Sequence, residues 1–265
     1  MDWLQVVILA IVQGITEFLP VSSSAHLILV PVLTDWPDQG LAFDVALHLG
    51  SLSAVLIYFR QDIINMLQSW TRSLHTRQLD ADAKLAWAVI LGTIPVGLAG
   101  LLLKDTVETV LRSPVYLSVG LIGFGLLLGW ADWRFRGSRS EDQMNWKDVL
   151  FIGCAQALAL FPGTSRSGIT MTAALMLGLS REASARFSFL LSIPVIVLAC
   201  GLETIELIKS QVAVDWLQMA AGVVLSGISA YLCIHYFLAF IKRIGMQPFV
   251  VYRIVLGALL LWIFL

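Results

Sequence analysis

The sequence predicts an all-α polytopic membrane protein, and three observations support that prediction. Of the 265 residues, 58% are hydrophobic and only 13% are charged, with a mean hydropathy of +0.84, whereas soluble domains carry about 25% charged residues. Several apolar stretches are long enough to cross a bilayer core, which needs about 20 residues. Two more apolar regions are each interrupted by a polar, proline-containing motif.

The elements follow in chain order as two interrupted regions and six predicted spans. The interrupted regions are 3–33 and 148–179, and each half of such a region is too short to span alone, which favours re-entrant hairpins. The spans are 42–59, 85–103, 115–132, 187–208, 215–240 and 248–265.

Charge and cysteine content exclude several other classes. The net charge is −1, so nothing indicates a basic surface for nucleic acid. Met1-Asp2-Trp3 lacks the basic region of a signal peptide, so we expect no cleavage. Cys154, Cys200 and Cys233 lie singly in apolar stretches, which is typical of small buried side chains rather than metal ligands.

Basic residues fix the expected topology. They form four clusters, and an excess of Lys and Arg marks cytoplasmic loops. The clusters are Arg60, Arg72, Arg77 and Lys84; Arg134, Arg136, Arg139 and Lys147; Arg181 and Arg186; and Lys242 and Arg243. All four share a side only if 148–179 crosses the membrane an even number of times, as a hairpin does. The first interrupted region then lies toward the outer side.

The two interrupted regions resemble each other. Gln13, Leu19-Pro20 and Ser22-Ser23 match Gln156, Phe161-Pro162 and Thr164-Ser165 with one gap. Each region precedes three spans, so the second copy starts on the opposite side of the membrane. The sequence therefore predicts a single membrane domain with an inverted repeat, 1–132 and 148–265, joined by a cytoplasmic loop at 133–147. Two unrelated proline-broken helices are the alternative. Inverted repeats place a site at their interface near the midplane.

The first motif, QGITEFLPVSSSAH at 13–26, places polar chemistry inside an apolar region. An ionisable residue such as Glu17 costs roughly 2.5 to 3.5 kcal/mol to insert and is a functional candidate. Pro20 breaks the helix, and Ser22 and Ser23 can cap a new one, whose N-terminus suits an anion. Ser23 and His26 are three apart, hence neighbours on one helical face, which is the minimum for an activated nucleophile. A purely capping and packing role is the alternative.

The second motif, PGTSRSGIT at 162–170, adds a cation. Thr164 and Ser165 can cap a helix, and Ser167 follows in the same turn. The guanidinium of Arg166 needs an anionic partner in a membrane, and its planar fork suits phosphate oxygens. A structural Arg166–Glu17 ion pair is the alternative. Together the motifs predict a phosphate site inside the membrane.

Other polar residues predict less. Asp44 and His48 begin the first span and fit either the outer mouth of a site or solvation at the edge of the span. Glu203 and Glu206 are expected to be solvated near an outer end. For His75 we expect no catalytic role. His235 is expected to pack in its span.

Both motifs, with the stretch FSFLLSIP at 187–194, resemble the undecaprenyl-diphosphate phosphatases of the bacitracin-resistance protein family over essentially the whole chain. The resemblance implies hydrolysis of a C55 isoprenyl diphosphate in the bacterial inner membrane, recycling the carrier for peptidoglycan. It implies roles for Glu17, Ser23, His26 and Arg166, a site open to the periplasm, a homodimer, and a divalent cation, Mg²⁺ or Ca²⁺. Many relatives carry glutamate where Gln13 stands here, which leaves Glu17 as the main acidic metal ligand, with Gln13 assisting.

Three mechanisms stay open at this point. Ser23 attacks phosphorus with His26 as its base, His26 attacks while Ser23 orients phosphate, or water attacks directly. The rival function is transport, as a flippase of a phosphorylated polyprenyl lipid, since broken helices in inverted repeats are also a transporter signature. An intramembrane Ser/His protease is a third alternative, but it would give Arg166 no role in the reaction.

Overall fold

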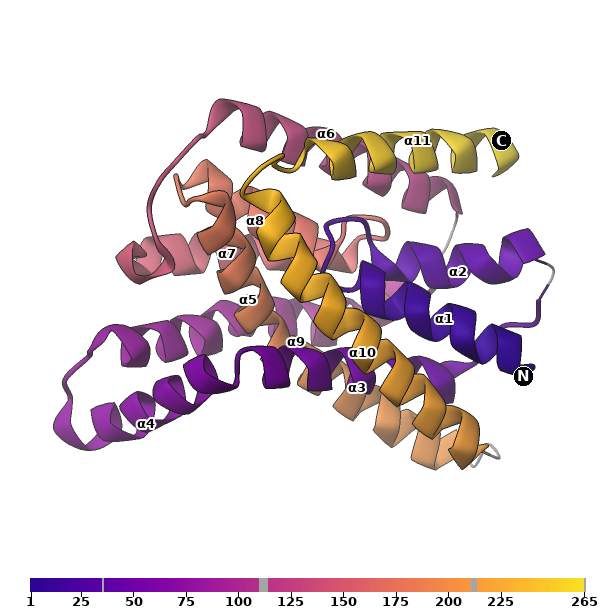
Figure 1. The fold of residues 1–265 in the computed structure, drawn as a ribbon, viewed down its shortest axis with the longest axis horizontal. Helices are drawn as coiled ribbons and strands as arrows, with labels where there is room; N and C mark the ends of the chain where they lie inside the picture. The colour runs from indigo at the N-terminus through magenta and orange to yellow at the C-terminus, as the bar shows by residue number, and fades with distance from the viewer. Residues whose placement is uncertain (35, 110–113, 211–213, 265) are drawn as a thin grey trace.

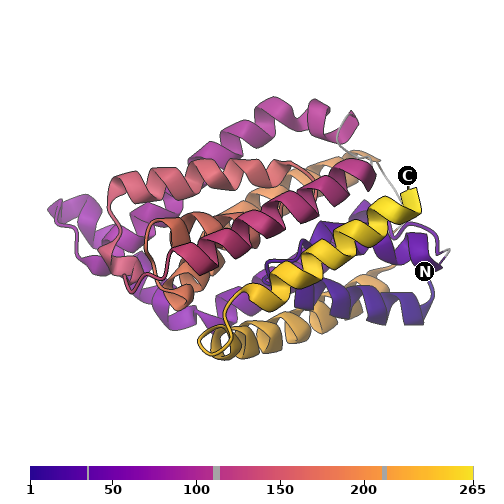
Figure 2. The ribbon, with the colours of Figure 1, turned by 90° about the horizontal axis from the view of Figure 1, so that it is seen from above.

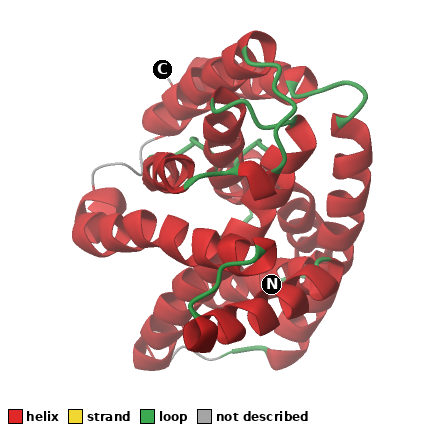
Figure 3. Ribbon diagram, turned by 90° about the vertical axis from the view of Figure 1, so that its left-hand side faces the viewer, coloured by secondary structure: helices red, strands yellow, loops and turns green. Residues whose placement is uncertain are grey.

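The computed structural model describes residues 1–34, 36–109, 114–210 and 214–264. In this described part the chain is almost wholly helical, with no strand and only an isolated bridge between Arg139 and Leu179 (Figure 3). The helices are α1 Trp3–Thr16, α2 Ser23–Thr34, α3 Leu41–Tyr58, α4 Arg60–Thr76, α5 Ala81–Thr109, α6 Pro114–Arg134, η1 Glu141–Gln143, α7 Trp146–Ala157, η2 Leu158–Leu160, α8 Arg166–Met176, α9 Arg181–Ser210, α10 Trp216–Ile241 and α11 Gln247–Phe264.

Within those described residues, six helices are long and apolar enough to cross a membrane, and they are the six predicted spans. They are α3, α5, α6, α9, α10 and α11. Most boundaries agree within a few residues, although α9 starts at Arg181, six residues before the predicted start. The predicted end of the last span, residue 265, lies outside the described residues. The prediction of an all-α polytopic membrane protein is confirmed.

Each interrupted region forms two short helices joined by a turn at the predicted motif. Helices α1 and α2 have 14 and 12 residues, and α7 and α8 have 12 and 11, so at 1.5 Å per residue each is at most about 21 Å long. That is shorter than the roughly 30 Å of a bilayer core. Ser22 and Ser165 directly precede α2 and α8, and both have positive φ, 72° and 68°. Such backbone is uncommon for residues other than glycine, so the two turns share an unusual local geometry.

The connection after the first span contains a helix that the sequence analysis did not assign. Helix α4 is amphipathic and largely exposed, with Met66 and Ser73 as its buried residues, and it projects at the left of Figure 1. Trp70 packs edge-on against Trp87 of α5, with ring centroids 5.9 Å apart. The apolar residues of α4 are too sparse to form a continuous apolar run, so the sequence pattern did not indicate this helix.

Helix pairing brings distant parts of the chain together. Helix α10 packs along α1 and α3, α7 packs on α5, and α3 packs on α9. Helices α6 and α11 run side by side (Figure 2). The core includes an aromatic contact between Phe18 and Phe189, whose ring centroids are 5.3 Å apart, and Phe189 also meets Phe237 of α10. Phe18 therefore fixes the turn after α1 against two spanning helices.

The elements that carry the four basic clusters contact one another at one end of the helix bundle, where Lys84 of α5 donates to the Asp142 carbonyl of η1. Ion pairs between the elements there join Arg186 to Asp62 and Glu141, Lys242 to Glu182, and Arg181 to Asp132. Arg139 adds a pair to Asp148 at the start of α7, with N and O 2.6 Å apart. Arg139 also donates to the Leu177 carbonyl just after α8, so the start of α7 and the end of α8 lie together at this end of the bundle.

Candidate active site

The turns that precede α2 and α8 lie against each other near the middle of the molecule (Figure 1). The Ser167 hydroxyl donates to the carbonyl of Leu19 across the two turns, at 2.8 Å. The two sequence motifs, more than a hundred residues apart, therefore build one site.

Arg253 of α11 binds both turns at once. Its guanidinium is fully buried and donates to five carbonyl oxygens, those of Leu121, Pro20, Gly120, Gly163 and Thr164, at 2.9 to 3.3 Å. A buried charge is tolerated only when its donors are satisfied, and here carbonyl dipoles do this. The sequence analysis missed Arg253, although a lone arginine inside an apolar span is itself a functional signal.

A glycine on α6 lets the second turn approach closely. A Cβ atom added to Gly120 would lie 2.0 Å from the carbonyl oxygen of Pro162. The turn itself needs Gly163, whose φ of +79° lies in the left-handed region. Helix α6 thus supports the turn from which Arg166 projects.

Glu17, directly after α1, is the centre of the polar contacts. Its Oε1 accepts from Arg166 Nη2 at 2.9 Å, and its Oε2 accepts from Ser23 Oγ at 2.8 Å and Gln13 Nε2 at 2.9 Å. His48 Nε2 lies 3.8 Å from Oε2. The Glu17 and Arg166 side chains are 8% and 13% exposed. The Arg166–Glu17 pair considered as an alternative therefore forms, and the same carboxylate also holds Ser23.

The surroundings keep Glu17 ionised. This residue lies outside the six spanning helices. Burial alone would raise its pKa, but the neighbouring charges of His48 and Arg166, with hydrogen bonds from Ser23 and Arg166, outweigh burial and place the pKa below its ordinary value. Glu17 is therefore held as a carboxylate.

These groups line a small cavity of about 180 Å³ at the starts of α2 and α8. Its polar walls are Glu17, Ser22, Ser23, Ser24, His48, Ser165 and Arg166. Helix N-termini carry unpaired N–H groups and a partial positive charge. Arg166 uses Nη1 for the Ser188 carbonyl and Nη2 for Glu17, and a guanidinium has five N–H donors, so donors remain for a ligand. The cavity is suited to an anion.

Two residues expected to bind phosphate are not among those that line this cavity. The Ser167 hydroxyl bonds to Ser165 and to the Leu19 carbonyl. The Thr164 hydroxyl is buried without a hydrogen-bond partner, while its carbonyl accepts from Arg253. Ser167 therefore joins the two turns through its side chain, while Thr164 contributes its backbone carbonyl to the contact with Arg253. Ser22 and Ser165 do line it.

His26 is not hydrogen-bonded to Ser23, which corrects the proposed Ser23–His26 pair. His26 Nδ1 donates to the Ser22 carbonyl at 2.8 Å, and Nε2 accepts from the Tyr252 hydroxyl at 2.6 Å. Burial holds the pKa of His26 below its ordinary value, although the bond to Ser22 opposes the shift. Both nitrogens of the neutral ring are occupied, so His26 braces the first turn against α11 in this structure. A spacing of three residues brings two side chains to the same face of a helix, but it does not determine which groups they hydrogen-bond.

His48 is the functional candidate that the sequence analysis ranked too low. Its side chain is 28% exposed, lines the cavity and lies beside Glu17. The sequence feature that could have indicated His48 is an imidazole within an apolar span. Solvation at the edge of the span explained that imidazole equally well. Asp44, paired with it in the sequence, is not among the cavity residues and accepts from Gln39.

Comparison with known proteins gives one consistent result. Residues 6–259 match the model of the family described as bacitracin resistance protein BacA. The chain is 62% identical to undecaprenyl-diphosphatase 2 of Stutzerimonas stutzeri, covering 100% of this chain and 99% of the relative. It is 58% identical to the undecaprenyl-diphosphatase of Nitrosococcus oceani and 55% identical to that of Campylobacter concisus, with complete coverage of both chains in each case.

Proposed function

The chain belongs to the bacitracin resistance protein BacA family, and from that premise we propose that it hydrolyses undecaprenyl diphosphate to undecaprenyl phosphate and inorganic phosphate. This reaction recycles the lipid carrier for peptidoglycan synthesis and confers bacitracin resistance. The observation that carries the proposal is the shared carboxylate of Glu17, which holds a hydroxyl and a guanidinium at the edge of one anion-sized cavity.

Phosphate binding is assigned to Arg166 and to the starts of α2 and α8. The guanidinium and the helix N–H groups face negative charge as it develops on the phosphoryl oxygens, which is the main task in phosphoryl transfer. Ser22 and Ser165 contribute hydroxyls from matching positions before the two helices. We place the terminal phosphate between them.

Ser23 is assigned as the nucleophile and Glu17 as its base. The Ser23 hydroxyl already donates to Glu17 Oε2 at 2.8 Å. Its oxygen attacks the terminal phosphorus, its proton passes to Glu17, and the bond from phosphorus to the bridging oxygen breaks to release undecaprenyl phosphate. Water then attacks the phosphoserine, phosphate leaves, and Ser23 regains a proton from Glu17. His26 is assigned a positioning role because both of its ring nitrogens are engaged.

A divalent cation, Mg²⁺ or Ca²⁺, is compatible with this donor set. In the described part of the chain no three His, Cys, Asp or Glu residues group into a metal site. Glu17 offers a carboxylate, and the buried Oε1 of Gln13 lacks a hydrogen-bond partner. Mg²⁺ is usually bound by one or two carboxylates together with substrate phosphates. Glu17 and Gln13 would hold it with the diphosphate, where it would neutralise phosphate charge.

The site is assigned to the periplasmic half of an inverted repeat. The basic end of the bundle is cytoplasmic by the excess of Lys and Arg. Arg166 begins α8, whose 11 residues separate it from that end by about 16 Å. The pairing of α1 with α10 and of α7 with α5 supports a pseudo-two-fold relation between the halves, as do the α3–α9 and α6–α11 pairs. A homodimer stays a prediction of the family resemblance.

Trapping a phosphoenzyme tests the proposal. Purified protein is mixed with diphosphate labelled in its terminal phosphate, quenched in acid, and mapped by mass spectrometry. We expect label on Ser23 and a loss of turnover of about 10² to 10⁴ fold in Ser23→Ala, the range of a positioned acid–base pair. The control is Ser138→Ala, which removes an exposed hydroxyl that is not among the cavity residues. Label on His26, or full activity in Ser23→Ala, would overturn the assignment.

Transport of a phosphorylated polyprenyl lipid is the alternative, since broken helices also build transporters. Transport alone needs no hydroxyl held on a carboxylate. Phosphate release in detergent micelles, where there are no two sides, separates the two functions. Release with and without a chelator measures the cation requirement in the same assay.

A further inference from the structure

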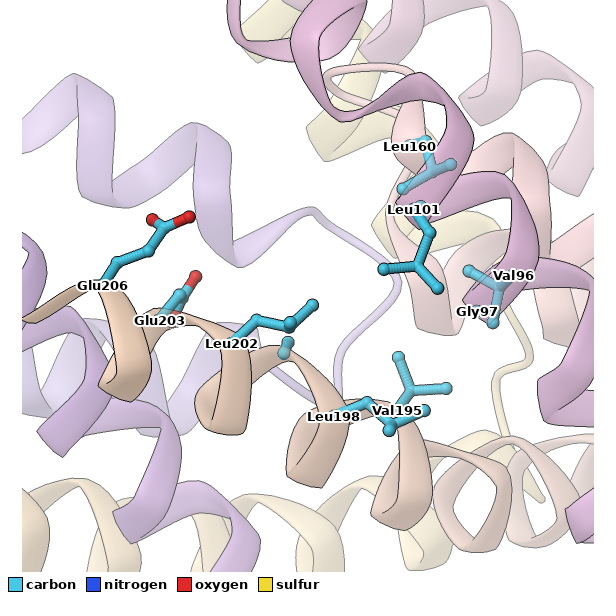
Figure 4. Close-up of a pocket in the computed structure, with 11 residues that line it drawn as sticks. Val96, Gly97, Leu101, Leu160, Val195, Leu198, Leu202, Glu203 and Glu206 are labelled. Atoms are coloured by element: carbon cyan, nitrogen blue, oxygen red, sulfur yellow. The ribbon is translucent and has the colours of Figure 1, made fainter.

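A second cavity, of about 460 Å³, lies beside the polar one, in a groove between α5 and α9 (Figure 4). Apolar side chains form most of its wall. In Figure 4 Leu198 and Leu202 follow each other along α9, while Leu101 of α5 and Leu160 of η2 lie across from them. Glu203 and Glu206 mark one end of the groove. Its middle is suited to a hydrocarbon chain.

The groove adjoins the polar cavity. Val195 and Ala199, one turn apart on α9, line both of them. The polar cavity measures about 180 Å³, below the roughly 300–1,000 Å³ of pockets that enclose a small molecule. It has room for phosphate groups and little more. A lipid held there by its phosphates must therefore leave along the wall formed by Val195 and Ala199.

The outer edge of the groove faces the bilayer. Leu101, Leu198 and Leu202 are 65%, 51% and 47% exposed, and they belong to helices that span the membrane. A chain that passes between them remains among apolar groups from the cavity to the lipid. The groove therefore fixes the position of the first isoprene units without exposing them to water.

Another apolar cavity, of about 510 Å³, offers the main competing path. It lies between α1 and α10 and includes Leu19, Leu232 and Tyr236. It shares no lining residue with the polar cavity. No continuous cavity therefore leads from a phosphate beside Arg166 to this apolar cavity. The groove between α5 and α9 is therefore favoured.

We propose that this groove binds the first isoprene units of the lipid substrate and directs the rest of the chain into the bilayer between α5 and α9. The inference rests on the proposed diphosphatase function. Two glycines keep the wall of the groove open. A Cβ atom on Gly97 would approach no atom closer than Leu198 Cδ1 at 4.0 Å, and one on Gly100 none closer than Leu160 Cδ2 at 3.9 Å. Larger side chains there would enter the groove without meeting backbone.

Filling the groove tests the proposal. Gly100→Leu and Gly97→Leu are compared with Gly201→Leu, which makes the same change on α9 at a position where nothing lies within 4 Å and which is not among the groove residues. Each purified variant is assayed on C55, C15 and C5 prenyl diphosphates. The C5 substrate reports on the polar cavity alone.

We expect the groove variants to raise KM for the C55 and C15 substrates at least tenfold, about 1.4 kcal/mol, and to leave kcat/KM for the C5 substrate within about twofold. Gly201→Leu should resemble the wild type. Unchanged KM for C55 in folded groove variants would overturn the proposal. An equal loss on all three substrates would also overturn it, since the polar cavity would then be what changed.

Crosslinking separates a failure of this proposal from a failure of the proposed function. A C15 diphosphate with a diazirine in its first isoprene units is irradiated with the wild-type protein, and the labelled peptides are mapped. Label at 195–202 of α9 supports the groove whether or not phosphate is released, whereas absence of phosphate release would count only against the diphosphatase function. Label at 229–237 of α10 would place the chain in the competing cavity.

Discussion

At the residue scale, the carboxylate of Glu17 holds together groups from three different helices. It accepts from Ser23 of α2 and Arg166 of α8, and it lies beside His48 of α3. Removing one member of a buried ion pair costs about 3–5 kcal/mol, because it leaves an uncompensated charge. The Arg166–Glu17 pair is therefore structural, because loss of either group leaves its partner unpaired, and in the proposed function the same loss also removes a binding contact.

His48 supplies a prediction at this scale. His48→Ala removes an imidazole from the cavity wall 3.8 Å from Glu17, so the carboxylate is less firmly placed. We expect kcat to fall at least tenfold, about 1.4 kcal/mol in the barrier, measured on C55 diphosphate in detergent. His75→Ala is the control, since His75 is exposed on α4. If both variants turn over at the wild-type rate, His48 has no part in the reaction.

At the scale of elements, the two turns are positioned by helices that contribute no reacting group. Helix α11 contributes Arg253, which joins the first turn at Pro20 to the second at Gly163 and Thr164. Helix α6 contributes the flat surface at Gly120. Lysine in place of Arg253 would keep the charge but lacks the planar set of donors that reaches several carbonyls together. The support of the site is therefore as specific as the site itself.

Gly120→Ala tests this support. The added methyl group would lie 2.0 Å from the Pro162 carbonyl, so the turn that carries Arg166 must shift. A misplacement of about 1 Å in a catalytic group costs roughly 10²-fold in rate, and we expect a loss of that order in kcat. Gly123→Ala, three residues along α6 where nothing lies within 4 Å, should be unaffected.

Thermal unfolding in detergent accompanies both assays. A Gly120→Ala protein that is as active as the wild type would show that the turn can move without displacing Arg166. A large fall in Tm with normal kcat would assign Gly120 to stability alone.

At the scale of the whole molecule, the charge distribution supports the proposed orientation of the chain. The ion pairs among α4, η1, α9 and the end of α10 gather basic residues at one end, and excess basic charge stays cytoplasmic. In the proposed orientation the polar cavity opens toward the periplasmic side, where it would meet the substrate diphosphate.

Labelling of single cysteines tests this orientation. In a variant with Cys154, Cys200 and Cys233 replaced by alanine, cysteine is introduced at Asp38, before α3, or at Gln68 on α4, both exposed. A membrane-impermeant maleimide added to intact spheroplasts should label Asp38→Cys and spare Gln68→Cys until the membrane is permeabilised. The reverse pattern would place the site on the cytoplasmic side.

Local chemistry made much of this protein predictable from its sequence. The lengths of the apolar runs must match the thickness of a bilayer, so the six spans were found with most boundaries within a few residues. Pro20 and Pro162 each stand among Ser, Thr or Gly residues that favour a turn or a new helix start, so both turns were found, whereas Pro31, Pro95 and Pro194 lie inside helices. The costly charges of Glu17 and Arg166 marked the site. Helix α4 was missed because its apolar residues are sparse, and Arg253 because a single charge in a long span was overlooked.

Only the tertiary structure decided which of those groups meet. Glu17 and Arg166 are separated by 149 residues, and spacing within one helix could not show that Ser23 turns to Glu17 while His26 turns to Tyr252. Spacing within a helix likewise could not show that His48 lines the cavity or that Thr164 and Ser167 do not. The sequence determined the elements and the chemistry, since those depend on local composition and on the membrane. The partners depend on how distant helices pack, which no local pattern contains.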